Sequence, residues 1–221
     1  MSILIKIAAV IPSLRKTNVR HEIAIRWGKT IFGLIPFWSY KVSGKENAKD
    51  DCYVIVANHS HLTDIWALYL TELNFRWVAK KELFRVPFLG SAMKNSGYIA
   101  VDRKSRISRA NSIAESKKHL DNRNSMLIFP EGKRNLKKEL LTFKAGAFNL
   151  SKDHNIKVLP IYISGANSLF KDKSLIPKKG HIHMEILEAV EIAEDETIEE
   201  FSIRTRDILS KEKALLDKAG L

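Results

Sequence analysis

Short apolar runs alternate with polar, periodic stretches along most of the chain, and this pattern predicts both strands and helices. Buried-strand patterns occur at residues 53–57, 98–101, 126–129, 158–163 and 181–186. Apolar positions at helical spacing follow at residues 64–73 and 105–120. Thr197, with Glu200 three residues later, predicts a capping box that opens a C-terminal helix ending near residue 218. This alternation predicts an α/β layered fold, in which Pro160 is expected near the edge or start of its strand.

The first quarter of the chain follows a different pattern. Residues 3–11 are apolar apart from Lys6, and residues 23–38 carry only two charges, Arg26 and Lys29. Neither stretch reaches the roughly 18 to 20 apolar residues that a bilayer span needs. Two short apolar helices with interspersed basic residues and closing aromatic residues indicate a pair that lies in the membrane interface. Because residues 44–51 are polar and rich in turn formers, we predict an N-terminal membrane-docking segment over 1–43 and a main domain over 44–221.

Composition and charge narrow the class of protein. With 221 residues and 45% hydrophobic residues, the chain suits one globular domain with an appendage. The formal net charge is +12, and residues 1–49 hold nine basic residues against two acidic ones. Such a balance indicates a polyanionic partner, and the apolar character of the basic segment favours an anionic membrane surface over nucleic acid. The single cysteine, Cys52, excludes an intramolecular disulfide and multi-cysteine metal sites, which is typical of a reducing compartment.

Candidate chemistry begins where the first of these strands ends. His59 lies just past the strand, and Asp64 comes five residues later. On one continuous helix the two side chains would lie about 140° apart, so they meet only if His59 is in the turn and Asp64 in the first helical turn. A carboxylate placed in this way would hold the imidazole in one tautomer and stabilise its cation, leaving the other ring nitrogen to take up a proton.

Ordered motifs then carry a resemblance to a known family. His59 and Asp64 form a His-x4-Asp block, followed by Gly97-Tyr98-Ile99-Ala100-Val101-Asp102-Arg103, Phe129-Pro130-Glu131-Gly132-Lys133-Arg134-Asn135 and Val158-Leu159-Pro160-Ile161. In this order they resemble the blocks of the 1-acylglycerol-3-phosphate O-acyltransferases, of the wider glycerolipid acyltransferase family. The third block departs from the family's Phe-Pro-Glu-Gly-Thr-Arg-Ser at Lys133 and Asn135, which leaves a different acceptor headgroup open.

The resemblance implies a fold, a reaction and roles for particular residues. The expected fold is a mixed sheet flanked by helices, with the site at the first strand-to-helix turn and facing the bilayer. His59 would deprotonate the hydroxyl of a lysophospholipid, most simply 1-acylglycerol-3-phosphate, as that oxygen attacks an acyl thioester, and Asp64 would orient the imidazole. Backbone N–H groups near the same turn would stabilise the oxyanion. The residues expected to place the phosphorylated acceptor are Lys80, Arg103, Glu131, Gly132 and Arg134.

The same resemblance bears on cofactors and location. No metal or other cofactor is expected, since acyl-CoA or acyl carrier protein serves as the donor, and both are anionic. We expect a monotopic or peripheral membrane protein that binds an anionic membrane surface, with its site on the cytoplasmic side. Acyl-chain length and the choice of donor stay open.

Other readings explain less of the sequence. His59, His61 and Asp64 could together ligate a metal ion, but no further cluster of ligands supports a metal hydrolase. Gly28-Lys29-Thr30 lacks the earlier glycine of a P-loop, and no Gly-x-Ser-x-Gly elbow occurs. The alternative from another class is a non-enzymatic basic membrane-binding protein. That reading accounts for the charge but not for the ordered motifs.

Overall fold

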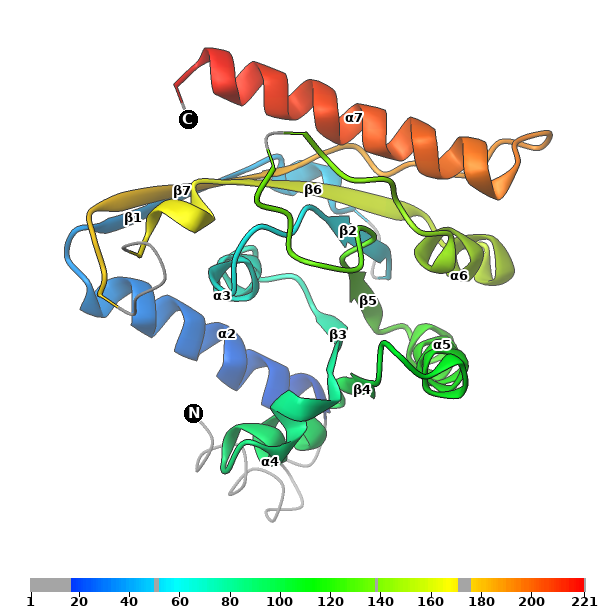
Figure 1. Cartoon of the computed structure of the whole chain (residues 1–221), viewed down its shortest axis with the longest axis horizontal. Helices are drawn as coiled ribbons and strands as arrows, with labels where there is room; N and C mark the ends of the chain where they lie inside the picture. Colours follow the sequence, from blue (N-terminus) through cyan, green and yellow to red (C-terminus); the bar gives the residue numbers. More distant parts are fainter. Residues whose placement is uncertain (1–16, 50–51, 138, 171–175, 221) are drawn as a thin grey trace.

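The computed structural model describes residues 17–49, 52–137, 139–170 and 176–220 as one layered α/β unit (Figure 1). In this part of the chain the strands are β1 (Trp38–Ser43), β2 (Val54–Ala57), β3 (Phe75–Lys80), β4 (Ile99–Val101), β5 (Ser125–Ile128), β6 (Val158–Ser164) and β7 (Gly180–Ile186). The α-helices are α2 (Thr17–Leu34), α3 (Thr63–Leu70), α4 (Leu89–Asn95), α5 (Arg106–Asp121), α6 (Gly146–His154) and α7 (Ile198–Lys218). Three short 3-10 helices are η2 (Lys45–Asn47), η3 (Lys81–Arg85) and η4 (Ala166–Ser168).

The strands form one mixed sheet in the order β1-β7-β6-β2-β5-β3-β4. Strands β6, β2, β5, β3 and β4 run parallel to one another, whereas β7 is antiparallel to β6 and parallel to β1. The carboxyl ends of the five parallel strands therefore lie at one edge of the sheet, where open α/β sheets place their ligands. The predicted mixed α/β sheet flanked by helices is confirmed.

Helices cover both faces of the sheet, and the alternation of side chains along β2 shows how. Ile55 and Ala57, together with Tyr53 just before the strand, point into the core that packs against α2 and α3. Val54 and Val56 point into the opposite core, formed with α5, α6 and α7. Figure 1 shows the same division, with α2 and α3 inside the curve of the sheet and α7 outside it. Because β2 is buried on both faces, it reads as a continuous apolar run.

The predicted N-terminal segment is only partly described. Its first apolar stretch, residues 3–11, lies outside the described residues. In the second stretch, Ala24, Phe32 and Trp38 are buried in the core beside α3, and β1 pairs with β7 over Trp38–Ser43. Helix α2 and strand β1 thus belong to the layered unit, because β1 is a strand of the sheet and buried side chains of α2 such as Ala24 and Phe32 pack in its core. The docking role of the segment and its boundary at residue 43 stay predictions.

Pro160 differs from expectation. It is the third residue of β6, a central strand, and pairs with Val56 of β2. A proline is tolerated there because the ladder to β7 covers only residues 161–164 of β6 and stops at Pro160. The Pro160 carbonyl still accepts a hydrogen bond from the Leu187 N–H at 2.9 Å. The predicted capping box of Thr197 and Glu200 is confirmed.

Candidate active site

His59 and Asp64 meet directly after β2. His59 lies in the turn, Asp64 lies in the first turn of α3, and His59 Nδ1 is 2.7 Å from Asp64 Oδ2. The Asp64 side chain is fully buried, whereas 13% of the His59 side chain is exposed. A carboxylate accepts hydrogen bonds only, so Nδ1 carries the proton and Nε2 is left as the basic nitrogen. The predicted geometry of this pair is confirmed.

Asp64 also shapes the loop that carries His59. Its Oδ2 accepts hydrogen bonds from the N–H groups of Ser60 at 2.7 Å and His61 at 2.8 Å, and the Ser60 hydroxyl lies 3.4 Å from Oδ1. An acid in the first turn of a helix is further stabilised by the helix dipole. One buried carboxylate therefore fixes both the imidazole and the backbone of residues 58–62, which we call the His59 loop.

Glu131 holds the same loop from the end of β5. Its side chain is 3% exposed, and its two carboxylate oxygens accept hydrogen bonds from the N–H groups of His59 at 3.1 Å and Leu141 at 3.0 Å. The family resemblance predicted that Glu131 helps to place the acceptor. Its observed contacts are with backbone, and they tie the segment after β5 to the residue that carries the imidazole.

Asn135 and Phe129 complete the support of His59. The N–H of Asn135 donates to the His59 carbonyl at 2.7 Å, and its buried side chain bonds to the backbone of Lys137 and Glu139. Phe129 stacks on the imidazole, with ring centroids 4.1 Å apart and planes inclined by 19°. In the sequence, Asn135 stands out only as a departure from the family's third motif. No local signal in the sequence points to either contact, because both bring together segments about 70 residues apart.

These contacts bear on the expected oxyanion donors. The N–H groups of His59, Ser60 and His61 all donate to carboxylates. The hydrogens of these three groups are therefore already bonded, and the expected oxyanion donors near this turn stay a prediction for its other backbone N–H groups. His61 itself bonds to the Thr63 hydroxyl at 3.1 Å, and burial lowers the pKa of its imidazole.

The predicted cationic residues lie at the same sheet edge on neighbouring strands. Lys80 ends β3 and pairs with Val101 of β4, so Arg103 follows at the adjacent strand end. Lys80 is 57% exposed and lies 3.6 Å from Glu82. Arg103 and Arg134 are also exposed. The topology thus brings Lys80 and Arg103 close together. Gly132 adopts φ +71°, a backbone conformation that L side chains rarely adopt.

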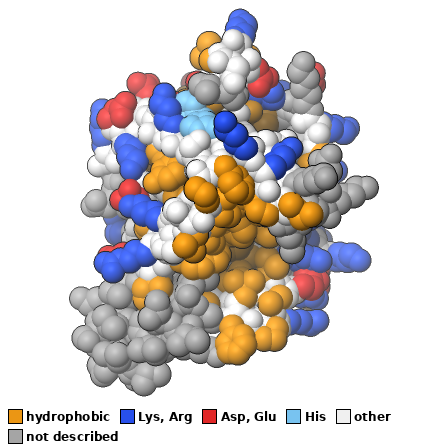
Figure 2. Space-filling view, turned by 90° about the vertical axis from the view of Figure 1, so that its left-hand side faces the viewer, with side chains coloured by type: hydrophobic (Ala, Val, Ile, Leu, Met, Phe, Trp, Pro, Cys, Tyr) orange, Lys and Arg blue, Asp and Glu red, His pale blue; other side chains and the backbone are white. Residues whose placement is uncertain are grey.

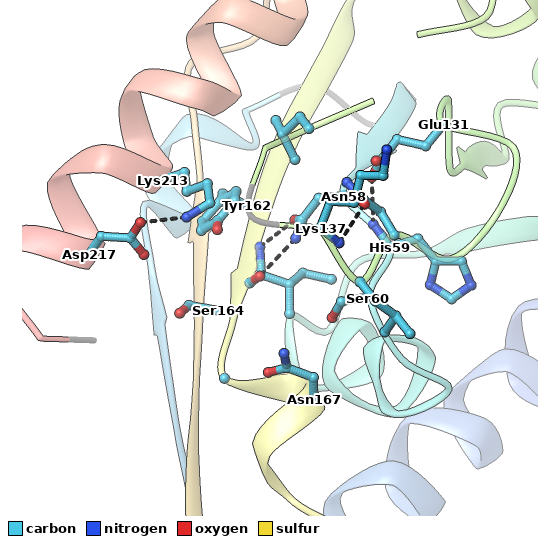
Figure 3. A pocket seen from close by; sticks show the side chains of 15 residues that line it. Asn58, His59, Ser60, Glu131, Lys137, Tyr162, Ser164, Asn167, Lys213 and Asp217 are labelled. Atoms are coloured by element: carbon cyan, nitrogen blue, oxygen red, sulfur yellow. Dashed lines mark hydrogen bonds and ion pairs between the residues drawn. The ribbon is translucent and has the colours of Figure 1, made fainter. Parts of the chain in front are cut away.

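Two cavities border the His59 loop on opposite sides. One, of about 360 Å³, lies between the ends of β2 and β6 and helix α7, and is mainly polar. Figure 3 shows that the His59 imidazole points away from Tyr162, Ser164 and Asp217 of this cavity, so His59 contributes its backbone to it. The second cavity, of about 280 Å³, is apolar and lies among α2, α3, η3 and α4, where Leu62 of the His59 loop lines it. Figure 2 shows a hollow lined by hydrophobic side chains on this side of the molecule, with Lys and Arg near its borders.

Comparison with known proteins gives the family. The model of the acyltransferase family matches residues 39–164, which include the whole of the His59 loop and the segment around Glu131. The chain belongs to the acyltransferase family. It is 32% identical over 173 residues to a 1-acyl-sn-glycerol-3-phosphate acyltransferase of Saccharomyces cerevisiae, covering 76% of this chain and 57% of that relative. It is 28% identical over 196 residues to the enzyme of the same name from Escherichia coli, covering 85% and 79%.

A solved acyltransferase has the same fold. The crystal structure of the 1-acyl-sn-glycerophosphate acyltransferase PlsC from Thermotoga maritima matches with a TM-score of 0.83 at 22% identity, covering 97% of this chain and 87% of that one. The matched regions span between 44% and 58% of the length of the first three curated relatives. Among the described residues, no helix has the length and hydropathy to cross a bilayer. The described part also holds no group of three or more His, Cys, Asp and Glu side chains that could hold a metal ion.

Proposed function

We propose that this acyltransferase moves a fatty acyl group from an acyl thioester to the free hydroxyl of 1-acylglycerol-3-phosphate, forming phosphatidic acid in phospholipid biosynthesis. The observation that carries the proposal is the buried Asp64 carboxylate bonded to His59 Nδ1, in a loop that Glu131 holds from the next strand. The names of the curated relatives support the choice of acceptor.

In the proposed reaction His59 acts as a general base. As the acceptor oxygen attacks the thioester carbonyl, His59 Nε2 takes the hydroxyl proton and Asp64 stabilises the imidazolium. The tetrahedral intermediate collapses with cleavage of the C–S bond, and the imidazolium returns the proton to the departing thiolate. The products are a phospholipid ester and a free thiol. The chemistry needs no cofactor besides the donor, and no acyl-enzyme, since Cys52 is buried.

We expect the acceptor phosphate to bind at the sheet edge and an acyl chain to bind in the apolar cavity. Lys80, Arg103 and Arg134 would attract the acceptor phosphate, which a guanidinium can bind bidentately. The cavity beside Leu62 has the apolar lining that an acyl chain needs. Leu62, which lines it, is three residues after His59 in the sequence. Lys133 is exposed in this region, so acceptors with other headgroups belong in the same experiment.

Location is part of the proposal. The enzyme would be a monotopic or peripheral membrane protein, with its site on the cytoplasmic side and its basic residues against anionic lipid. The test of the N-terminal segment is removal of residues 1–16, because a longer deletion would remove core residues such as Ala24 and Phe32. We expect this truncated protein to bind vesicles more weakly than wild type does. Unchanged binding would contradict the docking role of those residues.

The experiment that tests the function is a matrix of substrates. Purified protein is incubated with a panel of lysolipids and with both acyl-CoA and acyl-acyl carrier protein, while thiol release and lipid product are followed. We expect phosphatidic acid and thiol in equal amounts. Thiol release without lipid product would indicate a thioesterase, and no turnover of any pair would favour a non-enzymatic membrane-binding protein.

A further inference from the structure

An exposed apolar turn lies beside the cavity that Leu62 lines. Residues 85–89, which we call the Phe88 turn, connect η3 to α4, and Val86 and Phe88 are 44% and 63% exposed. Leu83 and Leu89, on either side of the tip of the turn, line the apolar cavity. Leu62, at the same cavity, is 48% exposed. Hydrophobic side chains are thus exposed together where they border a hollow, whereas single exposed ones are ordinary on a protein surface.

The backbone conformation of the Phe88 turn places Val86 and Phe88 at an exposed tip. Phe88 has φ +63° and ψ −48°, a conformation that side-chain-bearing residues rarely adopt. The turn is closed by hydrogen bonds from Leu89 N–H to the Pro87 carbonyl at 2.7 Å and from Gly90 N–H to the Val86 carbonyl at 2.9 Å. A Cβ on Gly90 would lie 2.0 Å from the Phe84 carbonyl oxygen, so this close approach requires glycine. Phe88 is therefore held outward by a tight, specific backbone.

Basic residues flank the apolar tip along the chain. Residues 80–95 contain four basic side chains, Lys80, Lys81, Arg85 and Lys94, and one acidic side chain, Glu82. Lys81 pairs with Asp102, and Lys80 lies near Glu82. Arg85 and Lys94 are exposed, and neither forms an ion pair with another described residue. An apolar tip flanked by basic side chains complements a bilayer whose headgroups are anionic.

We infer that the Phe88 turn is a membrane-docking surface, whose partner is the surface of an anionic bilayer. Phe88 and Val86 enter the boundary between headgroups and acyl chains, while Arg85 and Lys94 meet lipid phosphates. Docking in this orientation puts the apolar cavity against the bilayer, so that an acyl chain can pass between them without crossing water. The inference rests on residues of the turn and its flanking cations alone, and it does not depend on whether residues 1–16 bind lipid. A protein partner or a second copy of this chain is the competing occupant.

A site-specific probe tests the inference most sharply. Phe88→Cys is labelled with an environment-sensitive fluorophore, because the natural Cys52 is buried. Ile107→Cys, at a residue that is 74% exposed on α5, is the matched control. On vesicles of phosphatidylcholine with phosphatidylglycerol, emission at residue 88 should shift to the blue and emission at residue 107 should not. An unshifted Phe88 probe on vesicle-bound protein, or no vesicle binding at all, would overturn the inference.

Binding measurements with variants give the size of the effect. Val86→Ser/Phe88→Ser should lower the vesicle partition coefficient on the order of 10-fold. The control Ile107→Ser/Ile203→Ser should stay within about 2-fold of wild type, since its residues are exposed but on other helices. Arg85→Gln/Lys94→Gln should weaken binding to anionic vesicles and leave binding to pure phosphatidylcholine unchanged. Circular dichroism confirms that each variant is folded.

Two further outcomes separate the competing explanations. If sedimentation shows a concentration-dependent dimer that the Val86→Ser/Phe88→Ser variant loses, while its vesicle binding equals that of wild type, a second copy is the partner and the inference is wrong. If the Phe88 probe shifts but the wild-type protein transfers no acyl group, the proposed function fails and the docking surface stands. Turnover of a short-chain, water-soluble acceptor should be unchanged in the serine variant, because neither residue lines the cavity.

Discussion

The His59 loop and the ends of β3 and β4 lie at one edge of the sheet, yet they hold their side chains in different ways. Around His59, the imidazole and the Asp64 carboxylate that it bonds to are largely buried, and Asp64, Glu131 and Asn135 all bond to the loop backbone. At the neighbouring strand ends, the Lys80 and Arg103 side chains are exposed, and Lys80 lies near Glu82, an acid that is itself exposed.

The difference follows from what each group has to do. Proton transfer depends on distances of a fraction of an ångström, so the base gains from a fixed loop. Attraction of a phosphate acts over several ångströms, and exposed side chains can adjust to the ligand. The comparison therefore predicts large losses of turnover when the supports of His59 change, and smaller losses of acceptor binding when the exposed cations change.

The largest expected effect is that of Asp64→Asn. The asparagine amide has one acceptor oxygen in place of the two carboxylate oxygens, and it carries no charge to stabilise the imidazolium. We therefore expect kcat to fall by about 10²- to 10⁴-fold. The control Asp153→Asn removes an exposed acid that pairs with Lys117, and should leave kcat unchanged. Steady-state kinetics with saturating donor measure both. A loss below about 3-fold for Asp64→Asn would contradict the role of the pair.

Glu131→Gln comes next and tests whether Glu131 supports the loop or binds substrate. Glutamine keeps one acceptor oxygen and turns its amide towards a backbone N–H, so kcat should fall about 10-fold with little change in either KM. The free energy of unfolding should fall by about 1–3 kcal/mol. Urea unfolding and kinetics measure the two, with exposed Glu115→Gln as control. A raised acceptor KM at unchanged stability would instead mean that Glu131 contacts the acceptor.

Lys80→Ala and Arg134→Ala should have smaller effects. Each removes one exposed cation, so the KM of the phosphorylated acceptor should rise about 3- to 10-fold, while the KM of the donor stays unchanged. Lys117→Ala removes a partly exposed cation from α5, away from this edge of the sheet, and serves as control. Equal damage to both substrates would show that these cations support the fold and do not bind the phosphate.

The smallest effect on turnover is expected at the opposite end of β3. His21 is buried, bonds to the Leu73 carbonyl at 2.9 Å, and faces Arg76 and Tyr98. Burial, with Arg76 as a second cause, lowers its pKa to about 3. Between pH 6.5 and 3 the unfolded chain binds a proton there that the folded chain does not. Stability should therefore fall as the pH drops through this range, by up to about 1.4 kcal/mol per pH unit.

His21→Gln removes this titration. Its stability should depend less on pH below 6.5 than that of wild type, whereas kcat at neutral pH should stay within about 2-fold. Urea unfolding at a series of pH values checks the first expectation. An unchanged acid dependence would mean that other groups cause the loss of stability.

Local patterns explain which parts of the fold the sequence predicts. Strand β2 and the start of α7 are recognisable because burial on both faces and a capping box each leave a short-range signature. β3 was not predicted, because Arg76 and Lys80 interrupt its apolar pattern, and the buried Arg76 bonds to the carbonyl of its own neighbour Phe75. β1 was interpreted as part of an interfacial segment, since its aromatic residues suit a membrane interface as well as an edge strand.

In the site, too, short-range contacts can be predicted from the sequence and long-range contacts cannot. His59 and Asp64 are five residues apart, so spacing and a turn are enough to predict their contact. The bond of Glu131 to the His59 N–H joins residues 72 positions apart and depends on β2 and β5 being neighbours in the sheet. No pattern in the sequence shows that neighbourhood, so the resemblance of the motif could point to Glu131 without revealing what it holds.

The central claim is that His59, fixed by Asp64, is the base of the acyl transfer. The most direct test is the turnover of His59→Ala with acyl thioester and 1-acylglycerol-3-phosphate, measured as thiol release and as phosphatidic acid formed. We predict a loss of about 10²-fold or more, with unfolding and vesicle binding equal to those of wild type. Near-normal formation of phosphatidic acid by the folded variant would contradict the account.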